Sequence, residues 1–118
     1  MEPCKASVTV PADPAFARSV RMMASSLAIL CGMSMDDIDD VRMVAEEGFV
    51  LSCATGAESC DIAFSLEDGA MGIDFTLGPD EADDEDTQYA RLLLEAVCDE
   101  YEADAASGTL HALKRAVV

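Results

Sequence analysis

Basic residues are scarce in this chain: seven Lys and Arg stand against 24 Asp and Glu, which gives a formal net charge of −17. A surface of that charge repels nucleic-acid phosphates and anionic lipid headgroups. We therefore expect neither a nucleic acid nor a membrane as a partner. The charge favours solubility and a protein partner with a basic surface.

Histidine is nearly absent as well, since His111 is the single copy. A His-based metal cluster or a Ser-His-Asp triad could be assembled within one chain only around this residue, and we expect no metal site. The five cysteines, at positions 4, 31, 53, 60 and 98, are odd in number and contain no CxxC pair. They are expected to be reduced thiols that pack as small hydrophobes.

Long hydrophobic runs are missing too. The longest uncharged apolar-rich stretch, residues 22–35, is too short and too polar to span a bilayer. The N-terminus, MEPCKAS, lacks the basic-then-apolar pattern of a signal peptide. These absences lead us to expect a cytoplasmic protein.

The residues that are present fit one globular domain, residues 1–118. Hydrophobic residues make up 51% of the chain, and 118 residues can bury a modest core without disulfides. No internal repeat or low-complexity linker divides the sequence.

The first half predicts a short strand and a helix. Residues 6–10 alternate small, polar and β-branched side chains, as a strand does. Asp13 followed by Pro14 is a helix-start signature, and Gly32 can end the helix in a left-handed turn. Apolar residues at four- and three-residue steps predict its buried face: Phe16, Val20, Met23, Leu27 and Leu30.

A second helix follows at once, over residues 34–55. Ser34 is a plausible cap, and Asp36 and Asp37 place negative charge beside the first-turn N–H groups. Its additional apolar residues leave little polar surface, so we expect it to be central. One face is predicted to consist of Ile38, Val41, Ala45, Phe49 and Ser52.

The second half predicts a hairpin, a helix and a closing strand. Residues 60–66 and 71–77 alternate apolar and polar side chains, and Glu67-Asp68-Gly69 between them forms a tight turn. Residues 109–117 form the closing strand. The helix over 87–101 is expected to face inward through Tyr89, Leu92, Leu93, Ala96 and Val97.

The expected fold is therefore an α/β (α+β) two-layer sandwich of order β-α-α-β-β-α-β. Helices cover one face of a mixed four-stranded sheet, with the hairpin 60–77 in the middle of the chain order.

The second helix carries a resemblance to a known family. It is similar to the second helix of the anti-sigma-factor serine kinases, a branch of the GHKL (histidine-kinase-like) ATPases, which reads D-x-R-x-A-x-x-E-A-x-x-N-A. Asp40, Arg42 and Glu47 match, and the Asn that coordinates Mg²⁺ falls on Leu51. The resemblance implies a histidine-kinase-like ATPase fold and a catalytic role for Glu47. A leucine, however, offers no oxygen to a hard cation.

The end of the chain also resembles this family, whose closing strand reads G-T-x-h-x. Residues 108–112 are Gly-Thr-Leu-His-Ala, so the likeness spans about residues 6 to 117. The family's adenine-binding motif, D-x-G-x-G, is altered. Asp74 to Gly78 keeps an acid and one glycine, but the apolar alternation of 71–77 turns Asp74 away from the inward face. Alignment on Gly78-Pro79 instead puts Thr76 at the acid and Asp80 at the last glycine.

The family's phosphate-binding lid corresponds to residues 80–87, which contain six acids and no glycine. Glycine-free backbone does not readily form an anion nest, and the acids repel a triphosphate. The acids are interpreted as a solvated loop that leads into a helix N-terminus. A Ca²⁺ or Mg²⁺ loop would need the spaced glycine and twelfth-position Glu of an EF-hand, which are absent.

Two functions remain open from the sequence. The first is a regulator that binds a protein, with no cofactor. The resemblance implies a sigma factor or an anti-sigma antagonist as partner, and pairing into homodimers. The second is an ATP- and Mg²⁺-dependent serine/threonine protein kinase with a remodelled site, in which Glu47 orients or deprotonates the substrate hydroxyl. In the first case one of Glu46 and Glu47 faces solvent and the other fills a partly exposed helix position, or Glu47 is an ancestral remnant of catalysis.

Overall fold

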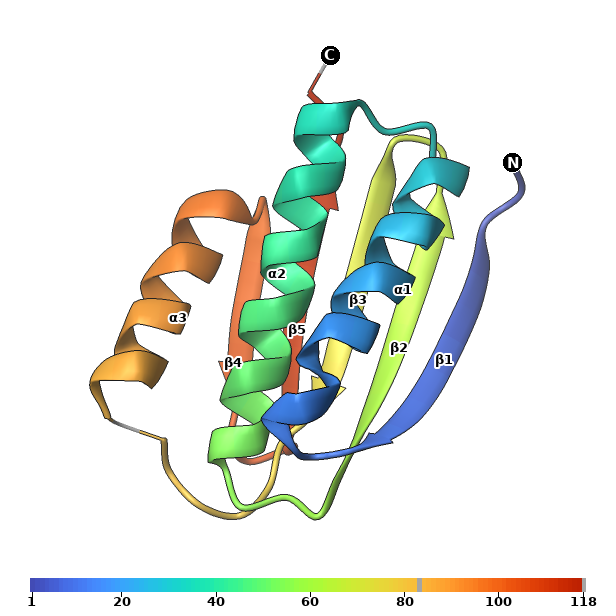
Figure 1. The fold of residues 1–118 in the computed structure, drawn as a ribbon. Coiled ribbons are helices and arrows are strands. Elements are labelled where there is room, and N and C mark those ends of the chain that lie inside the picture. Colours follow the sequence, from blue (N-terminus) through green and yellow to red (C-terminus); the bar gives the residue numbers. More distant parts are fainter. Residues whose placement is uncertain (83, 118) are drawn as a thin grey trace.

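One layer of helices covers one face of an antiparallel sheet (Figure 1). The computed structural model describes residues 1–82 and 84–117. Its strands are β1 (Cys4–Pro11), β2 (Ser59–Glu67), β3 (Ala70–Thr76), β4 (Glu100–Asp104) and β5 (Thr109–Arg115). Its helices are α1 (Ala17–Leu30), α2 (Met35–Ala54) and α3 (Glu85–Val97), and a short 3-10 helix, Pro14–Phe16, precedes α1.

The local signals for the first two helices are confirmed. The Asp13 carboxylate accepts a hydrogen bond from the Ala15 N–H at 2.9 Å, and the Ser34 hydroxyl accepts one from the Asp37 N–H at 3.2 Å. Gly32 has a φ of +73°, in the left-handed region that a helix-ending glycine adopts readily. Helix α2 lies between α1 and α3, as its scarcity of polar surface predicts (Figure 1).

The sheet differs from the expected one. In the described ranges it has five strands in the order β1-β2-β3-β5-β4, and every neighbouring pair is antiparallel. The expectation of four strands in a mixed sheet is therefore wrong. Strand β4 runs parallel to β3 after the α3 crossover, but β5 inserts between the two and pairs antiparallel with both.

Strand β4 was missed because its sequence does not resemble a strand. The helix predicted to reach residue 101 ends at Val97, and residues 100–104 (EYEAD) contain no β-branched side chain. Pairing with β5 outweighs this weak local preference, as Tyr101 lies opposite Ala112 and Ala103 opposite Leu110.

Helix α3 is rotated relative to the prediction. Its buried residues are Thr87, Ala90 and Leu94, whereas Tyr89 and Leu92 are 62% and 64% exposed. Ala96 is exposed as well, so three of the five residues expected to face inward do not. Small residues decide the packed face, because Ala90 lets the helix approach its neighbours closely.

Small residues have the same effect on α1. Its buried residues are Val20, Ala24 and Ala28, while Phe16 and Leu30, both predicted to be inward, are 37% and 60% exposed. The larger Met23 and Leu27 lie at the edge of the packed face and are partly buried.

The core lies between the two layers. The inward residues of β2 and β3 follow the predicted alternation, and Ile62, Phe64 and Phe75 are among the largest fully buried side chains. From α2, Phe49 is completely buried against them. Gly48 lets the Phe75 ring lie directly on the helix backbone, because a Cβ at position 48 would overlap two carbons of that ring.

Replacing Gly48 with alanine should therefore destabilise the protein. Phe75 is 1% exposed, so its ring has no room to move aside. We expect the free energy of unfolding to fall by roughly 1–3 kcal/mol, even though alanine is the better helix former. Urea unfolding followed by circular dichroism measures the change. Gly72→Ala is the control, because a Cβ there meets its nearest neighbour at 3.6 Å. Equal losses in the two variants would contradict this account of the packing.

Candidate functional site

The first half of the family-like motif on α2 contacts the chain's own charged residues. The Asp40 carboxylate lies 3.5 Å from the Lys114 ammonium of β5, and the Arg42 guanidinium lies 3.6 Å from Asp39 one turn earlier. Lys114 is only 8% exposed, so the Asp40 pair ties the helix to the sheet. These two motif residues therefore have structural partners.

Glu46 and Glu47 have different surroundings although they are neighbours. The Glu46 carboxylate accepts a hydrogen bond from the Arg21 guanidinium of α1 at 3.0 Å. Glu47 is half-buried, and burial raises the pKa of its carboxyl, with a further contribution from the charge of Glu46. A carboxyl with a raised pKa holds its proton more readily, which is a property of general acids and bases as well as of crowded helix positions.

Leu51 lies inside the core. It is 3% exposed and belongs to the same hydrophobic cluster as Phe49 and Phe75. The next residue, Ser52, is fully buried and its hydroxyl donates a hydrogen bond to the Thr76 carbonyl at 2.6 Å. This turn of α2 is thus packed against the end of β3 and presents no oxygen ligand at position 51.

Asp74 lies on the other face of the sheet, away from the helices, as the alternation of β3 predicts. Its carboxylate is 2.6 Å from Nδ1 of His111, which lies directly opposite on β5. The structure therefore does not bring Asp74 together with Glu47 and Leu51. Gly78, the last of the motif-equivalent residues, follows β3 and reaches the C-terminal end of α2.

The contact between Gly78 and α2 is made by Thr55. The Thr55 hydroxyl accepts a hydrogen bond from the Gly78 N–H and donates one to the Ser52 carbonyl, both at 2.6 Å. The Thr55 carbonyl accepts a third from the Asp80 N–H at 2.9 Å. A Cβ at position 78 would overlap the Thr55 carbonyl, so the close approach requires glycine.

Beside this contact lies a cavity of about 550 Å³, between the loop after β3, helix α3 and the region of β4. Gly78 is one of its lining residues, whereas Glu47, Leu51 and Asp74 are not. The charged and aromatic side chains that line it are Asp80, Glu81, Arg91, Glu95 and Tyr101. The apolar part of the lining includes Leu77 and Ala103.

The lining of this cavity is more negative than positive. Three carboxylates surround one guanidinium, that of Arg91. Burial raises the pKa of the Tyr101 phenol, and the nearby Arg91 opposes that shift in part. Such a lining favours a cationic or neutral group over a polyphosphate.

Sequence reasoning missed the roles of Thr55, Arg91 and Tyr101. Thr55 just before Gly56 could have been recognised as a hydroxyl at a helix C-terminus, but its bond to Gly78 is long-range. Tyr101 reaches the cavity only because β4 is a strand, which local preference did not indicate.

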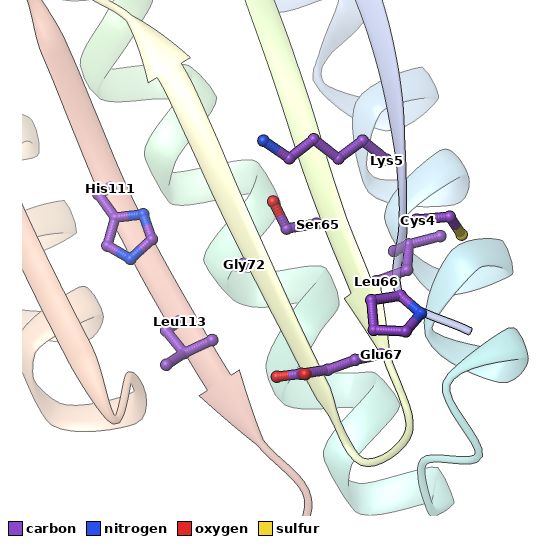
Figure 2. A pocket seen from close by; sticks show the side chains of 9 residues that line it. Cys4, Lys5, Ser65, Leu66, Glu67, Gly72, His111 and Leu113 are labelled. Carbon is purple, nitrogen blue, oxygen red and sulfur yellow. The ribbon is translucent and has the colours of Figure 1, made fainter. Parts of the chain in front are cut away.

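A second hollow, of about 360 Å³, lies on the helix-free face of the sheet. Figure 2 shows Lys5 of β1 and His111 of β5 on opposite sides of it, with Ser65 and the bare backbone of Gly72 between them. Glu67 lines the end near the β2–β3 turn. Its lining mixes both signs of charge.

The thiols carry no sign of catalysis. Burial raises the pKa of Cys53 and of Cys98 to about 11, which keeps both protonated near neutral pH. All five cysteines are free, and Cys31 and Cys60 are buried.

Within residues 1–82 and 84–117, no three His, Cys, Asp or Glu side chains are grouped so that they could hold a metal ion. In the same ranges, no helix has the length and apolar character needed to cross a membrane.

Comparison with solved structures identifies the fold. The chain aligns over 98% of its length with the crystal structure of the RsbU and RsbW domains of Rv1364c from Mycobacterium tuberculosis, at a TM-score of 0.68 and 19% sequence identity. It spans 35% of that chain. No family model and no curated protein matches the sequence.

The raised pKa of Glu47 predicts a dependence of stability on pH. Because the folded-state pKa lies above the unfolded value, the contribution of Glu47 to stability is complete below the unfolded pKa and is lost as pH rises through the folded pKa. Glu47→Gln cannot ionise, so we expect its stability relative to wild type to be greater at neutral pH than at about pH 4. Urea unfolding across this pH range measures the difference.

Glu46→Gln provides the control for the cause of the shift. It removes the neighbouring charge but leaves Glu47 half-buried, so the Glu47 pKa should move only part of the way back in an NMR titration. A Glu47 carboxyl that titrates at or below the ordinary glutamate value in the wild-type protein would contradict the prediction.

Proposed function

We propose that this chain is a regulatory protein-binding domain that acts as an anti-sigma factor, and that it does so without ATP binding or kinase activity. The observation that carries the proposal is the fold it shares over 98% of its length with part of a structure that contains an RsbW domain. The sequence of α2 independently resembles the second helix of the anti-sigma-factor serine kinases, a branch of the GHKL ATPases. The motif residues Asp40, Arg42 and Glu47 on α2 agree with this relationship.

The loss of ATP binding is supported by two features of the site. Leu51 occupies the position of the metal-binding Asn, and it is buried among apolar side chains where no ion could reach it. The cavity next to Gly78 is lined by three carboxylates and one guanidinium, which opposes the charge of a triphosphate. These residues do not fit Mg²⁺–ATP, and we assign the chain no chemical step that uses it.

A partner with a basic surface is supported by the net charge of −17. A sigma factor or an anti-sigma antagonist is the partner that the family relationship favours. Opposite charges on the two surfaces would steer their encounter and raise the association rate.

The enzyme alternative rests on Glu47. Its raised pKa and its position in the motif are those of a group that could accept a proton from a substrate hydroxyl. In that case the chain is a serine/threonine protein kinase whose nucleotide is held by other residues than those of the family.

A thermal-shift experiment separates the two functions. We expect no change in melting temperature with millimolar ATP–Mg²⁺, whereas a ligand at a hundredfold excess over its Kd would stabilise the fold by about 2.7 kcal/mol. Leu51→Asn should not restore binding, because the acidic cavity is unchanged. It should also lower the free energy of unfolding by roughly 2–4 kcal/mol, since an amide replaces a buried leucine.

A clear rise in melting temperature of the wild-type protein with ATP–Mg²⁺ that Glu47→Ala abolishes would instead favour the kinase.

Leu92→Asn is the control for the stability cost of Leu51→Asn, because Leu92 is exposed and should tolerate the change within about 0.5 kcal/mol.

The association rate with a sigma factor should fall steeply as salt is added. Electrostatic steering is screened beyond about 8 Å at physiological ionic strength, so the rate at low salt should exceed that at 0.5 M by about tenfold or more. Stopped-flow mixing with the purified sigma factor at several salt concentrations measures this. A rate that is indifferent to salt would show that the acidic surface does not guide the encounter.

A further inference from the structure

Helix α3 has apolar side chains on two opposite faces, and the chain covers only one of them. The buried face consists of Thr87, Ala90 and Leu94. On the outer face, Tyr89 and Leu92 are 62% and 64% exposed, and Ala96 is exposed one turn later. Residues at these three- and four-residue steps lie along one line of a helix, so they form a continuous apolar stripe. We call Tyr89, Leu92 and Ala96 the α3 stripe.

Acidic residues frame the α3 stripe. Glu85 and Asp86 lie in the first turn of α3 and Glu95 in its last turn, all of them exposed. The basic residue of this helix, Arg91, is half-buried and lines the cavity between α3 and the loop after β3. The outer surface of α3 is therefore apolar along its centre and negative along its borders.

Helix α1 also has exposed apolar residues, but no acidic residues of its own surround them. Met22 and Ile29 are 52% and 65% exposed, as much as the residues of the α3 stripe. The sequence of α1 contains Arg18 and Arg21 but no acidic residue. Met22 and Ile29 thus match the stripe in exposure and helical setting and differ from it in the charge of their surroundings.

The acidic residues around the α3 stripe determine which kind of partner can bind there. A second copy of this chain would bring one negative border against another, and each copy carries a net charge of −17, so self-association through this face is opposed. A partner helix with an apolar stripe bordered by Lys and Arg would bury the α3 stripe and pair its basic residues with the acidic residues beside it.

We propose that the α3 stripe is a docking surface for an amphipathic helix of a partner protein, with an apolar centre and basic borders. This inference deepens the proposed regulatory function and rests on it for the existence of a partner. The cavity beside α3 extends the surface. Glu95 borders the stripe and also lines the cavity with Asp80 and Glu81, so a long basic side chain from the docked helix can enter it.

The test uses a synthetic helical peptide of about 18 residues, with Leu at helix-stripe spacing and Lys on both borders. Fluorescence anisotropy with the full chain measures its Kd. We expect the double variant Tyr89→Ala/Leu92→Ala to weaken binding by about tenfold or more, because truncation of central anchors dominates interface energies. The matched variant Met22→Ala/Ile29→Ala should bind as the wild type does. Both pairs are exposed, so neither is expected to disturb the fold.

A charge exchange tests the acidic frame. Glu85→Lys/Glu95→Lys should weaken binding of the Lys-bordered peptide and strengthen binding of a peptide with Glu on its borders. A peptide of the same composition in scrambled order should bind at least tenfold more weakly than the helical one.

The peptide measurements would overturn the proposal if the α1 and α3 variants lost binding equally, if the charge exchange had no effect, or if the scrambled peptide bound as well as the helical one. A concentration-dependent dimer in sedimentation that Leu92→Asp abolishes would also overturn it, in favour of a second copy as the occupant. The peptide measurements need no sigma factor, so their failure is separate from failure of the proposed function. If a sigma factor binds and Tyr89→Ala/Leu92→Ala leaves that affinity unchanged, the result supports the proposed function and contradicts the α3 stripe as the docking surface.

Discussion

The contact between Gly48 and the Phe75 ring sets the spacing of the two layers. Because position 48 lacks a Cβ, the ring of Phe75 on β3 lies against the backbone of α2, the central helix. Other contacts between α2 and the end of β3 depend on this approach. The Ser52 hydroxyl reaches the Thr76 carbonyl at 2.6 Å, and one turn later Thr55 binds the Gly78 N–H at the same distance. Thr55 and Gly78, which form the last of these contacts, also line the cavity.

The few basic residues of the chain act largely within it. Arg21 pairs with Glu46, and Lys114 pairs with Asp40, so α2 is tied by charge to both α1 and β5. Acidic residues gather instead at the N-terminal ends of α2 and α3, where the helix dipole stabilises negative charge. The result is a molecule whose outer surface is strongly negative. The basic partner proposed above would be complementary to such a surface.

Much of the fold could be predicted from the sequence because its signals are local. The Ser34 cap, the left-handed Gly32 and the alternation of the β2–β3 hairpin each depend on residues a few positions apart. Of the candidate site, the outward direction of Asp74 could be predicted for the same reason. The burial of Leu51 and the contact of Thr55 with Gly78 could not, since the partners are more than 20 residues away in the chain or belong to several elements.

Helix α3 and strand β4 show the limit of local signals. The spacing of the apolar residues in α3 allows either of two helix faces to be buried. In the folded protein the face with Ala90 and Leu94 is buried, and the face with Tyr89 and Leu92 is exposed. In residues 100–104 a weak local preference yielded to pairing with β5. The sequence by itself determined where the helices and the hairpin form, and the sign of the surface charge. Only the tertiary structure decided which apolar stripe is covered and which residues line the cavity, because both depend on the close approach of elements distant in the chain.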